Sequence, residues 1–121
     1  MEYKEEIIDH YKFPRNQGEM KHPDKLVREA NSSCGDMVEI AVLFAEDGKG
    51  IKTIKEIKWR GLGCAISTAA ASMLSEKAVG MSREKLEKIG DRGIVEMLGG
   101  EINPGRMKCA TLAYRGLLKA F

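Results

Sequence analysis

Residues 38–63 read VEIAVLFAEDGKGIKTIKEIKWRGLG, and this stretch decides the fold. In residues 38–44 the apolar side chains recur at every second position, which is typical of a strand with one buried face. A turn at residues 46–50 separates this stretch from a second alternating stretch at residues 51–60, and together they predict an antiparallel hairpin. After the GLG of residues 61–63 the apolar spacing becomes helical.

The pattern stays helical toward the C-terminus. Apolar residues from Ile66 to Ala78 follow the i, i+3, i+4, i+7 spacing of an amphipathic helix. We predict three more helices: one capped by Ser82 and running to about Ile89, a short one from Asp91 to residues 99–100, and a last one over residues 110–121.

The N-terminal side adds a helix and a short strand. Residues 3–12 predict a helix, with Tyr3 and His10 on or beside its apolar face, and Pro14 disfavours its continuation. A loop at residues 15–24 and a short strand at residues 25–30 follow. Because strands and helices are segregated along the chain, we expect an α+β fold with helices on one face of a small antiparallel sheet, and a single domain over residues 1–121.

Composition excludes several classes of protein. With 43% hydrophobic and 31% charged residues, the chain has the make-up of a globular domain and not of a disordered segment. Twenty Lys and Arg against 18 Asp and Glu give a net charge of +2, which offers no electrostatic case for nucleic-acid binding. No apolar stretch is long enough for a membrane helix, and the acidic N-terminus is unlike a secretory signal. We therefore expect a cytoplasmic protein whose cysteines stay reduced.

The three cysteines are Cys34, Cys64 and Cys109, and each lies near the end of a predicted element. No two of them form a CxxC pair, so their spacing alone does not define a zinc site. A structural cysteine is more often part of an apolar stripe. The positions therefore favour a shared site, although three unrelated core cysteines remain an alternative.

Asp36 adds a fourth candidate ligand. It follows Cys34 by two residues, and in an extended segment such residues point the same way. Three thiolates and one carboxylate suit tetrahedral zinc, and they equally suit a small iron–sulfur cluster with one exchangeable oxygen ligand. The basic residues Arg60, Arg106 and Lys108 are close in sequence to the cysteines and could offset the negative charge of this set, or they could belong to the solvated surface.

Cys109 is expected to be the most easily ionised of the three thiols. It lies near the start of the last predicted helix, with Arg106 and Lys108 as neighbours. The helix dipole and positive charge both favour a thiolate, so we expect a lowered pKa for Cys109. His10 is expected to pack against the fold and His22 to be solvated, and neither is expected to be a ligand.

Three motifs carry a resemblance to a known family. They are SCGD at residues 33–36, GLGCAIS at residues 61–67 and RMKCA at residues 106–110, preceded by DHY at residues 9–11 and PRN at residues 14–16. This sequence resembles the IscU/NifU N-terminal domain/SufU family of iron–sulfur cluster assembly scaffold proteins, from about Tyr3 to Phe121.

The resemblance implies a fold, a ligand set and partners. The fold is a three-stranded antiparallel sheet with helices on one face. The implied ligands of a transient [2Fe–2S] cluster or of Zn²⁺ are Cys34, Asp36, Cys64 and Cys109. The implied partners are a cysteine desulfurase that uses pyridoxal phosphate (PLP), apo iron–sulfur acceptor proteins and, in a homodimer, a second copy. Because the desulfurase delivers sulfur as a persulfide, Cys109 is the candidate sulfur acceptor. Tyr3 is a candidate for sulfur transfer or dimer contact.

Two branches of the family remain open. IscU-type members have histidine directly before the third cysteine, where this sequence has Lys108, and a basic residue there is similar to the SufU branch. The SufU branch usually has an insertion before that cysteine, for which this chain leaves little room. Residues 102–106 also depart from the Leu-Pro-Pro-Val-Lys motif that a dedicated Hsp70 chaperone recognises. A scaffold, a zinc-dependent sulfurtransferase and a purely structural zinc domain are therefore the functions to distinguish.

Overall fold

The elements follow the predicted order of helix, strands, helices. The computed structural model describes residues 4–32 and 35–121. The described elements are α1 (Glu5–Lys12), β1 (Lys25–Asn31), β2 (Asp36–Glu46), β3 (Lys52–Leu62), α2 (Ala65–Lys77), α3 (Arg83–Met97), the 3₁₀ helix η1 (Pro104–Arg106), α4 (Met107–Ala110) and α5 (Leu112–Leu118).

The sheet is antiparallel and has the strand order β1-β2-β3. In the predicted hairpin Val42 pairs with Ile57 and Ile40 with Trp59, and a bulge lies between Leu43 and Phe44. The pairing extends to the last residue of β3, Leu62, which lies opposite Met37 near the start of β2. The predicted α+β class and the three-stranded sheet are thus confirmed.

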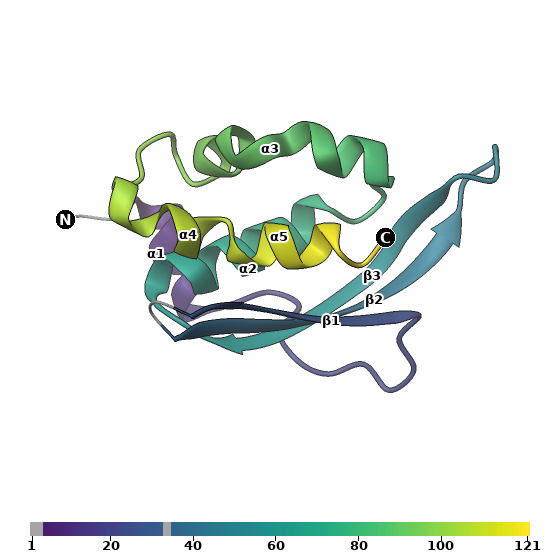
Figure 1. Cartoon of the computed structure of the whole chain (residues 1–121), viewed down its shortest axis with the longest axis horizontal. Coiled ribbons are helices and arrows are strands. Elements are labelled where there is room, and N and C mark those ends of the chain that lie inside the picture. The colour runs from purple at the N-terminus through teal and green to yellow at the C-terminus, as the bar shows by residue number, and fades with distance from the viewer. Residues whose placement is uncertain (1–3, 33–34) are drawn as a thin grey trace.

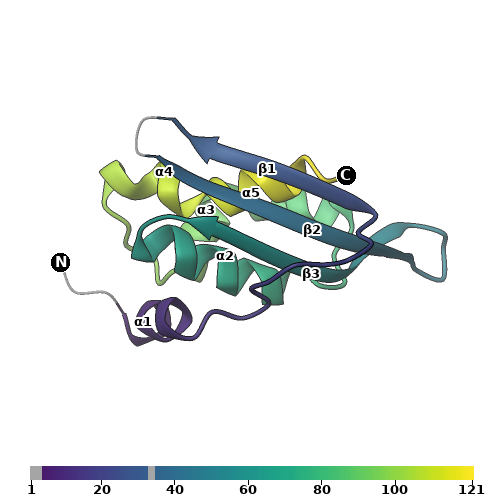
Figure 2. The same ribbon diagram turned by 90° about the horizontal axis from the view of Figure 1, so that it is seen from below.

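The helices lie on one face of the sheet (Figure 1). Figure 2, seen from below, shows the three strands in front of α2 and α5, with α1 beside α2. Helix α3 lies beyond α2 and α5, on their far side from the sheet. The core forms where the apolar face of β2 and β3 meets α2 and α5, and its buried side chains include Val42, Ile57, Trp59, Leu74 and Leu117. This layering brings the start of β2, the start of α2 and helix α4 to the same side of the molecule.

Two breaks divide the helical part of the chain. Gly90, with a φ of 64°, interrupts α3 between the two helices predicted there, and Ser82 caps its start by accepting a hydrogen bond from the Lys85 N–H. The last predicted helix is divided: Thr111, with φ −99° and ψ 2°, separates α4 from α5. Because the apolar stripe continues across Thr111, periodicity alone predicts one helix there.

A network of part-buried hydrogen bonds fastens α1 and the loop after it to α2 and β3. His10 Nδ1 lies 2.7 Å from Ser72 Oγ, which also accepts the Arg15 N–H at 2.8 Å, and the Trp59 indole N–H donates to the Arg15 carbonyl at 2.8 Å. The predicted packing of His10 is confirmed. The pairing of a serine with a histidine resembles part of a catalytic triad, but Ser72 is completely buried and acts in packing.

No helix in residues 4–32 and 35–121 combines the length and apolar character needed to cross a membrane.

Candidate metal centre

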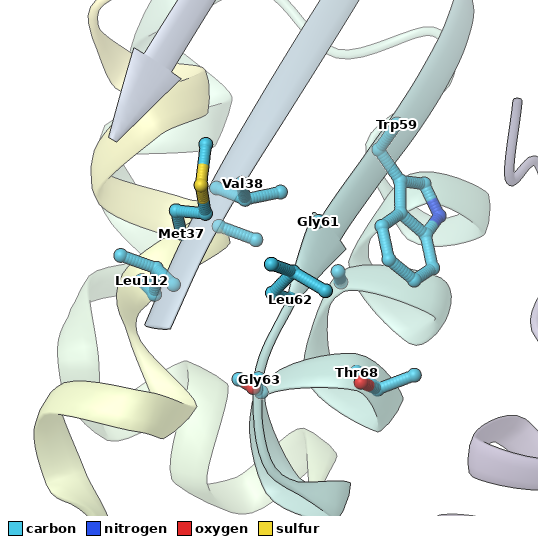
Figure 3. A pocket seen from close by; sticks show the side chains of 11 residues that line it. Met37, Val38, Trp59, Gly61, Leu62, Gly63, Thr68 and Leu112 are labelled. Atoms are coloured by element: carbon cyan, nitrogen blue, oxygen red, sulfur yellow. The ribbon is translucent and has the colours of Figure 1, made fainter. Parts of the chain in front are cut away.

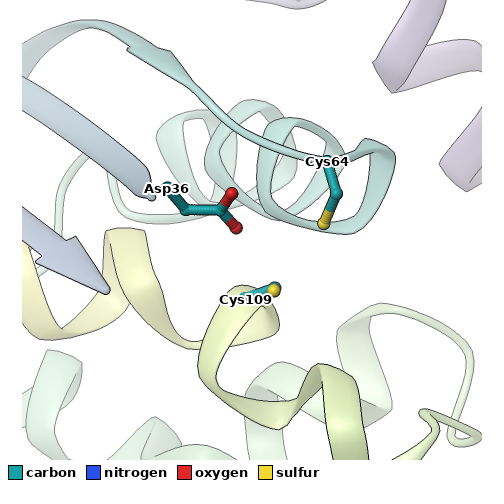
Figure 4. A group of neighbouring side chains, drawn as sticks. All are labelled: Asp36, Cys64 and Cys109. Atoms are coloured by element: carbon teal, nitrogen blue, oxygen red, sulfur yellow. The ribbon is translucent and has the colours of Figure 1, made fainter. Parts of the chain in front are cut away.

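Asp36, Cys64 and Cys109 converge at one end of the sheet (Figure 4). Asp36 begins β2, Cys64 immediately precedes α2, and Cys109 belongs to α4. One ligand atom from each of the three side chains lies within 4.8 Å of the other two. The structure thus brings together three of the four predicted ligands, whereas Cys34 lies outside the described residues and its role stays a prediction.

Cys64 is positioned by the start of α2. It occupies the N-cap in an extended conformation, and its carbonyl accepts hydrogen bonds from the Thr68 N–H at 3.1 Å and from Ser67 Oγ at 3.0 Å. Gly63 allows this turn to pack tightly, since a Cβ atom there would lie 2.1 Å from Ser67 Oγ and 3.3 Å from Asp36 Cγ. The glycine before the cysteine therefore keeps the space between Cys64 and Asp36 open.

Cys109 is buried in a very short helix. Its residue is 4% exposed, and α4 spans only four residues between η1 and the break at Thr111. Cys64 is half-buried by comparison. The two thiols are therefore unequal: solvent and reagents reach Cys64 more readily than Cys109.

Asp36 supplies the negative charge of the group. The residue is 7% exposed, and its Oδ2 atom has no hydrogen-bond partner in the part of the chain that the structure describes. A buried carboxylate oxygen without a partner is energetically costly, and a cation bound beside it removes that cost. The donor set, two thiols and a carboxylate, fits zinc or iron on this ground.

The pKa values of the two thiols move in opposite directions. Burial raises the pKa of Cys64, but hydrogen bonds from the Ser67 N–H and hydroxyl, the Cys109 thiol and the Ile66 N–H outweigh it, so the pKa is lowered overall. Burial, with the Asp36 carboxylate and Cys64 beside it, raises the pKa of Cys109 to about 12. The predicted lowering of the Cys109 pKa is therefore wrong, because burial and a neighbouring carboxylate outweigh a short helix and two basic side chains that are exposed to solvent.

Basic side chains near the cysteines in sequence are on the surface. Arg60 lies on the outer face of the sheet, where it forms ion pairs with Glu39 at 2.9 Å and with Glu19. Lys108 and Arg106 are exposed. For Arg60 the surface interpretation is therefore the correct one.

An apolar rim beside the metal centre was not predicted. A shallow pocket at the ends of β2 and β3 is lined by residues that include Met37, Leu62, Gly63 and Thr68 (Figure 3). Met37 and Leu62 are paired across the strands and are 41% and 71% exposed. The sequence does hold a signal for it, because Leu62 lies between two glycines. Once the strand register is known, strand alternation places this leucine on the outward face of the sheet.

Three relatives cover nearly all of this chain. It is 32% identical over 98% of its length to the iron–sulfur cluster assembly scaffold protein IscU 1 of Archaeoglobus fulgidus, of which it covers 73%. It is 33% identical over 97% of its length to the zinc-dependent sulfurtransferase SufU of Bacillus subtilis, of which it covers 87%. It is 36% identical over 98% of its length to the bifunctional protein NifU/MnmA of Rubrobacter xylanophilus, but it spans only 24% of that protein.

The solved structures agree with the sequence relatives. FiSufU, a SUF-system protein of Fervidobacterium islandicum AW-1, superposes with a TM-score of 0.76 at 28% identity, over 98% of this chain and 95% of that one. The fold, with a carboxylate and thiols gathered at one end of its sheet, is thus of the IscU and SufU class. Residues 2–121 match the NifU-like N-terminal domain, and the chain belongs to that family, as its three cysteine motifs indicated.

Proposed function

We propose that the protein is an iron–sulfur cluster assembly scaffold. It receives sulfur from a PLP-dependent cysteine desulfurase, builds a [2Fe–2S] cluster on Cys34, Asp36, Cys64 and Cys109, and passes the cluster to apoproteins. The observation that carries the proposal is the convergence of Asp36, Cys64 and Cys109 within 4.8 Å. Membership of the NifU-like family and the likeness to a relative named as a scaffold support it.

The mixed ligand set suits a cluster that must leave. Thiolates bind zinc and the sulfide-bound iron of a cluster strongly, whereas a carboxylate is a harder ligand and holds the iron of a cluster less tightly. Asp36 therefore offers a position from which an incoming thiolate of an acceptor protein can displace the scaffold. The half-buried Cys64, beside the exposed Leu62, provides a side from which such a protein can approach.

Cys109 is the proposed sulfur acceptor. In the transfer its thiolate attacks the outer sulfur of the desulfurase persulfide, so that a new S–S bond forms on Cys109 and the desulfurase cysteine leaves as a thiolate. A bound metal deprotonates the thiols that coordinate it, which would overcome the raised pKa of Cys109. Reduction of the transferred sulfur to sulfide takes two electrons, which a thiol reductant supplies in the reconstitution described below.

The second candidate function is a zinc-dependent sulfurtransferase. In that case zinc holds the thiolates at the same residues, and sulfur is accepted and passed on without a cluster. The SufU relative, aligned over 97% of this chain, favours this candidate, as does the exposed Lys108 where IscU-type members have histidine. The structural zinc domain is less well supported, because structural zinc sites consist of Cys and His.

Anaerobic reconstitution distinguishes these candidates. The protein is incubated with a cysteine desulfurase, cysteine, ferrous iron and dithiothreitol, and the visible spectrum and metal content are recorded. We expect a [2Fe–2S] chromophore that transfers to apo-ferredoxin and that is lost in Cys64→Ser and Cys109→Ser. Asp91→Ala, which removes an exposed carboxylate of α3, is the control and should behave as the wild type.

The outcome also identifies the alternatives. Stoichiometric zinc without an iron chromophore contradicts the scaffold. If the zinc-loaded protein then accepts persulfide sulfur, mapped by mass spectrometry, the sulfurtransferase is supported. If it accepts none, the structural zinc domain is what remains. Sulfur found on Cys34 or Cys64, with Cys109→Ser accepting it at the wild-type rate, contradicts the acceptor role of Cys109.

A further inference from the structure

The carbonyl oxygen of Lys108, the residue before Cys109, is held by two side chains from other elements. Asn31 Nδ2, at the end of β1, donates to it at 3.0 Å, and Arg115 Nη2, from α5, donates to it at 2.9 Å. The same Arg115 nitrogen also donates to Asn31 Oδ1 at 2.6 Å. The three groups thus form a closed triangle of hydrogen bonds beside the metal centre.

Asn31 also belongs to the other side of the metal centre. It pairs with Asp36 across the β1–β2 ladder, and its carbonyl accepts the Gly35 N–H at 2.9 Å. Its side chain is almost completely buried, at 4% exposure for the residue. One residue therefore fixes the start of β2 through its backbone and the approach to Cys109 through its side chain.

Helix α4 needs such support from outside. Four residues are too few for a helix that is stable by itself, and the break at Thr111 separates α4 from α5. Arg115 reaches back across this break, since its Nε also donates to the Thr111 carbonyl at 3.4 Å. The direction in which Cys109 points therefore depends on contacts made by α5 and β1.

We propose that Asn31 and Arg115 are positioning residues of the metal centre. They hold α4 against the end of β1, so that the Cys109 thiol stays within ligand distance of the Asp36 carboxylate. The inference rests on the proposed function in one respect, that the site binds a metal. Side chains that orient metal ligands without touching the metal typically change affinity by about 10- to 100-fold when they are lost.

Two variants break the triangle in different ways. Asn31→Asp keeps an oxygen that accepts from Arg115, but it replaces the donor to Lys108 by an acceptor that repels the carbonyl. Arg115→Met keeps much of the aliphatic side chain and removes the guanidinium. The matched control is Lys119→Met, which breaks another link between α5 and β1, the 2.6 Å ion pair with Glu29, one helical turn farther on.

The test measures metal binding and metal geometry separately from cluster assembly. Zn²⁺ affinity is measured by competition with a chromophoric chelator, and Co²⁺ is added to record the charge-transfer and d–d bands that report thiolate ligation. We expect Asn31→Asp and Arg115→Met to weaken zinc binding by about 10- to 100-fold and to change the cobalt bands. The double variant should lose little more than either single variant, because both act on one carbonyl. Lys119→Met should keep the wild-type affinity and spectrum.

Each other outcome overturns the inference. Wild-type affinity and cobalt bands in both variants would show that the triangle does not position Cys109, and an equal loss in Lys119→Met would show a general loosening of α5. A wild-type protein that binds neither metal would overturn the metal centre itself, and this inference with it. Thermal melting of the metal-free proteins checks folding, and if either variant fails to fold, Arg115→Lys is judged by the same criteria.

Discussion

Gly61 of β3 lies directly against the backbone of Met37 in β2: a Cβ atom at Gly61 would be only 2.2 Å from the Met37 carbonyl oxygen. The obstacle is backbone of the neighbouring strand, which cannot rotate away as a side chain can. Strand packing thus requires glycine at position 61, three residues before the candidate ligand Cys64.

Replacing Gly61 should therefore destabilise the fold. We expect Gly61→Ala to lower the free energy of unfolding by roughly 1–3 kcal/mol, as for other additions to a tightly packed region. Denaturant unfolding followed by circular dichroism measures it. The control is Gly48→Ala in the hairpin turn, where a Cβ atom meets nothing within 4 Å. Equal stability of Gly61→Ala and the wild type would show that the strands separate at this point without cost.

Alkylation should separate the two described thiols in the metal-free protein. Because the pKa of Cys64 is lowered and that of Cys109 is raised to about 12, thiolate forms first on Cys64 as the pH increases. In a Cys34→Ser background, iodoacetamide between pH 7 and 9 should label Cys64 well before Cys109, with the rate at Cys64 rising with pH. Peptide mass spectrometry gives both rates, and protein unfolded in guanidinium, where the rates should be similar, is the control. Faster labelling of Cys109 in the folded protein would contradict the pKa order.

Asp36 should control how long a bound cluster lasts. Because the carboxylate is the hardest ligand of the set, its removal takes away the position at which water or an acceptor thiolate displaces the scaffold. We expect Asp36→Ala to hold a reconstituted cluster longer in air and to transfer it more slowly to apo-ferredoxin. Decay of the visible absorbance measures the lifetime. A shorter lifetime than that of the wild type would count against the idea.

Tyr114 should stabilise the kink of α3 through its hydroxyl group. The hydroxyl donates to the Leu86 carbonyl at 2.7 Å and accepts the Gly90 N–H at 2.9 Å, and the residue is buried. Tyr114→Phe leaves both backbone groups without this partner, so we expect a loss of about 1–3 kcal/mol in the free energy of unfolding. Tyr11→Phe on the exposed side of α1 should change stability by less than about 0.5 kcal/mol. A Tyr114→Phe protein as stable as the wild type would mean that other groups replace the hydroxyl.

Sequence reasoning reached the features that depend on local pattern. Alternation over residues 38–60 predicted the hairpin, and the glycine and cysteine motifs predicted Asp36, Cys64 and Cys109 as members of one site. Local pattern could not predict the break at Thr111, because the apolar stripe runs through it, nor the hydrogen bond between Asn31 and Arg115, which joins residues far apart in the chain.

For the same reason, the local sequence pattern could not predict which of the two thiols has the lower pKa. The charges beside Cys109 in sequence, Arg106 and Lys108, are exposed, while the carboxylate that matters comes from β2. Burial and long-range neighbours dominate a thiol pKa, and both are known only once the chain is folded.

The three candidate ligands that the structure describes, Asp36, Cys64 and Cys109, come from segments that are widely separated along the chain. An ion held by them would act as a cross-link between the sheet layer and the helical layer. Such a cross-link can close only after both layers have docked. During synthesis the complete group therefore cannot assemble until the segment containing Cys109 has left the ribosome. On the proposed function, metal binding would therefore stabilise the docked arrangement of the two layers, and separation of either layer would weaken the site.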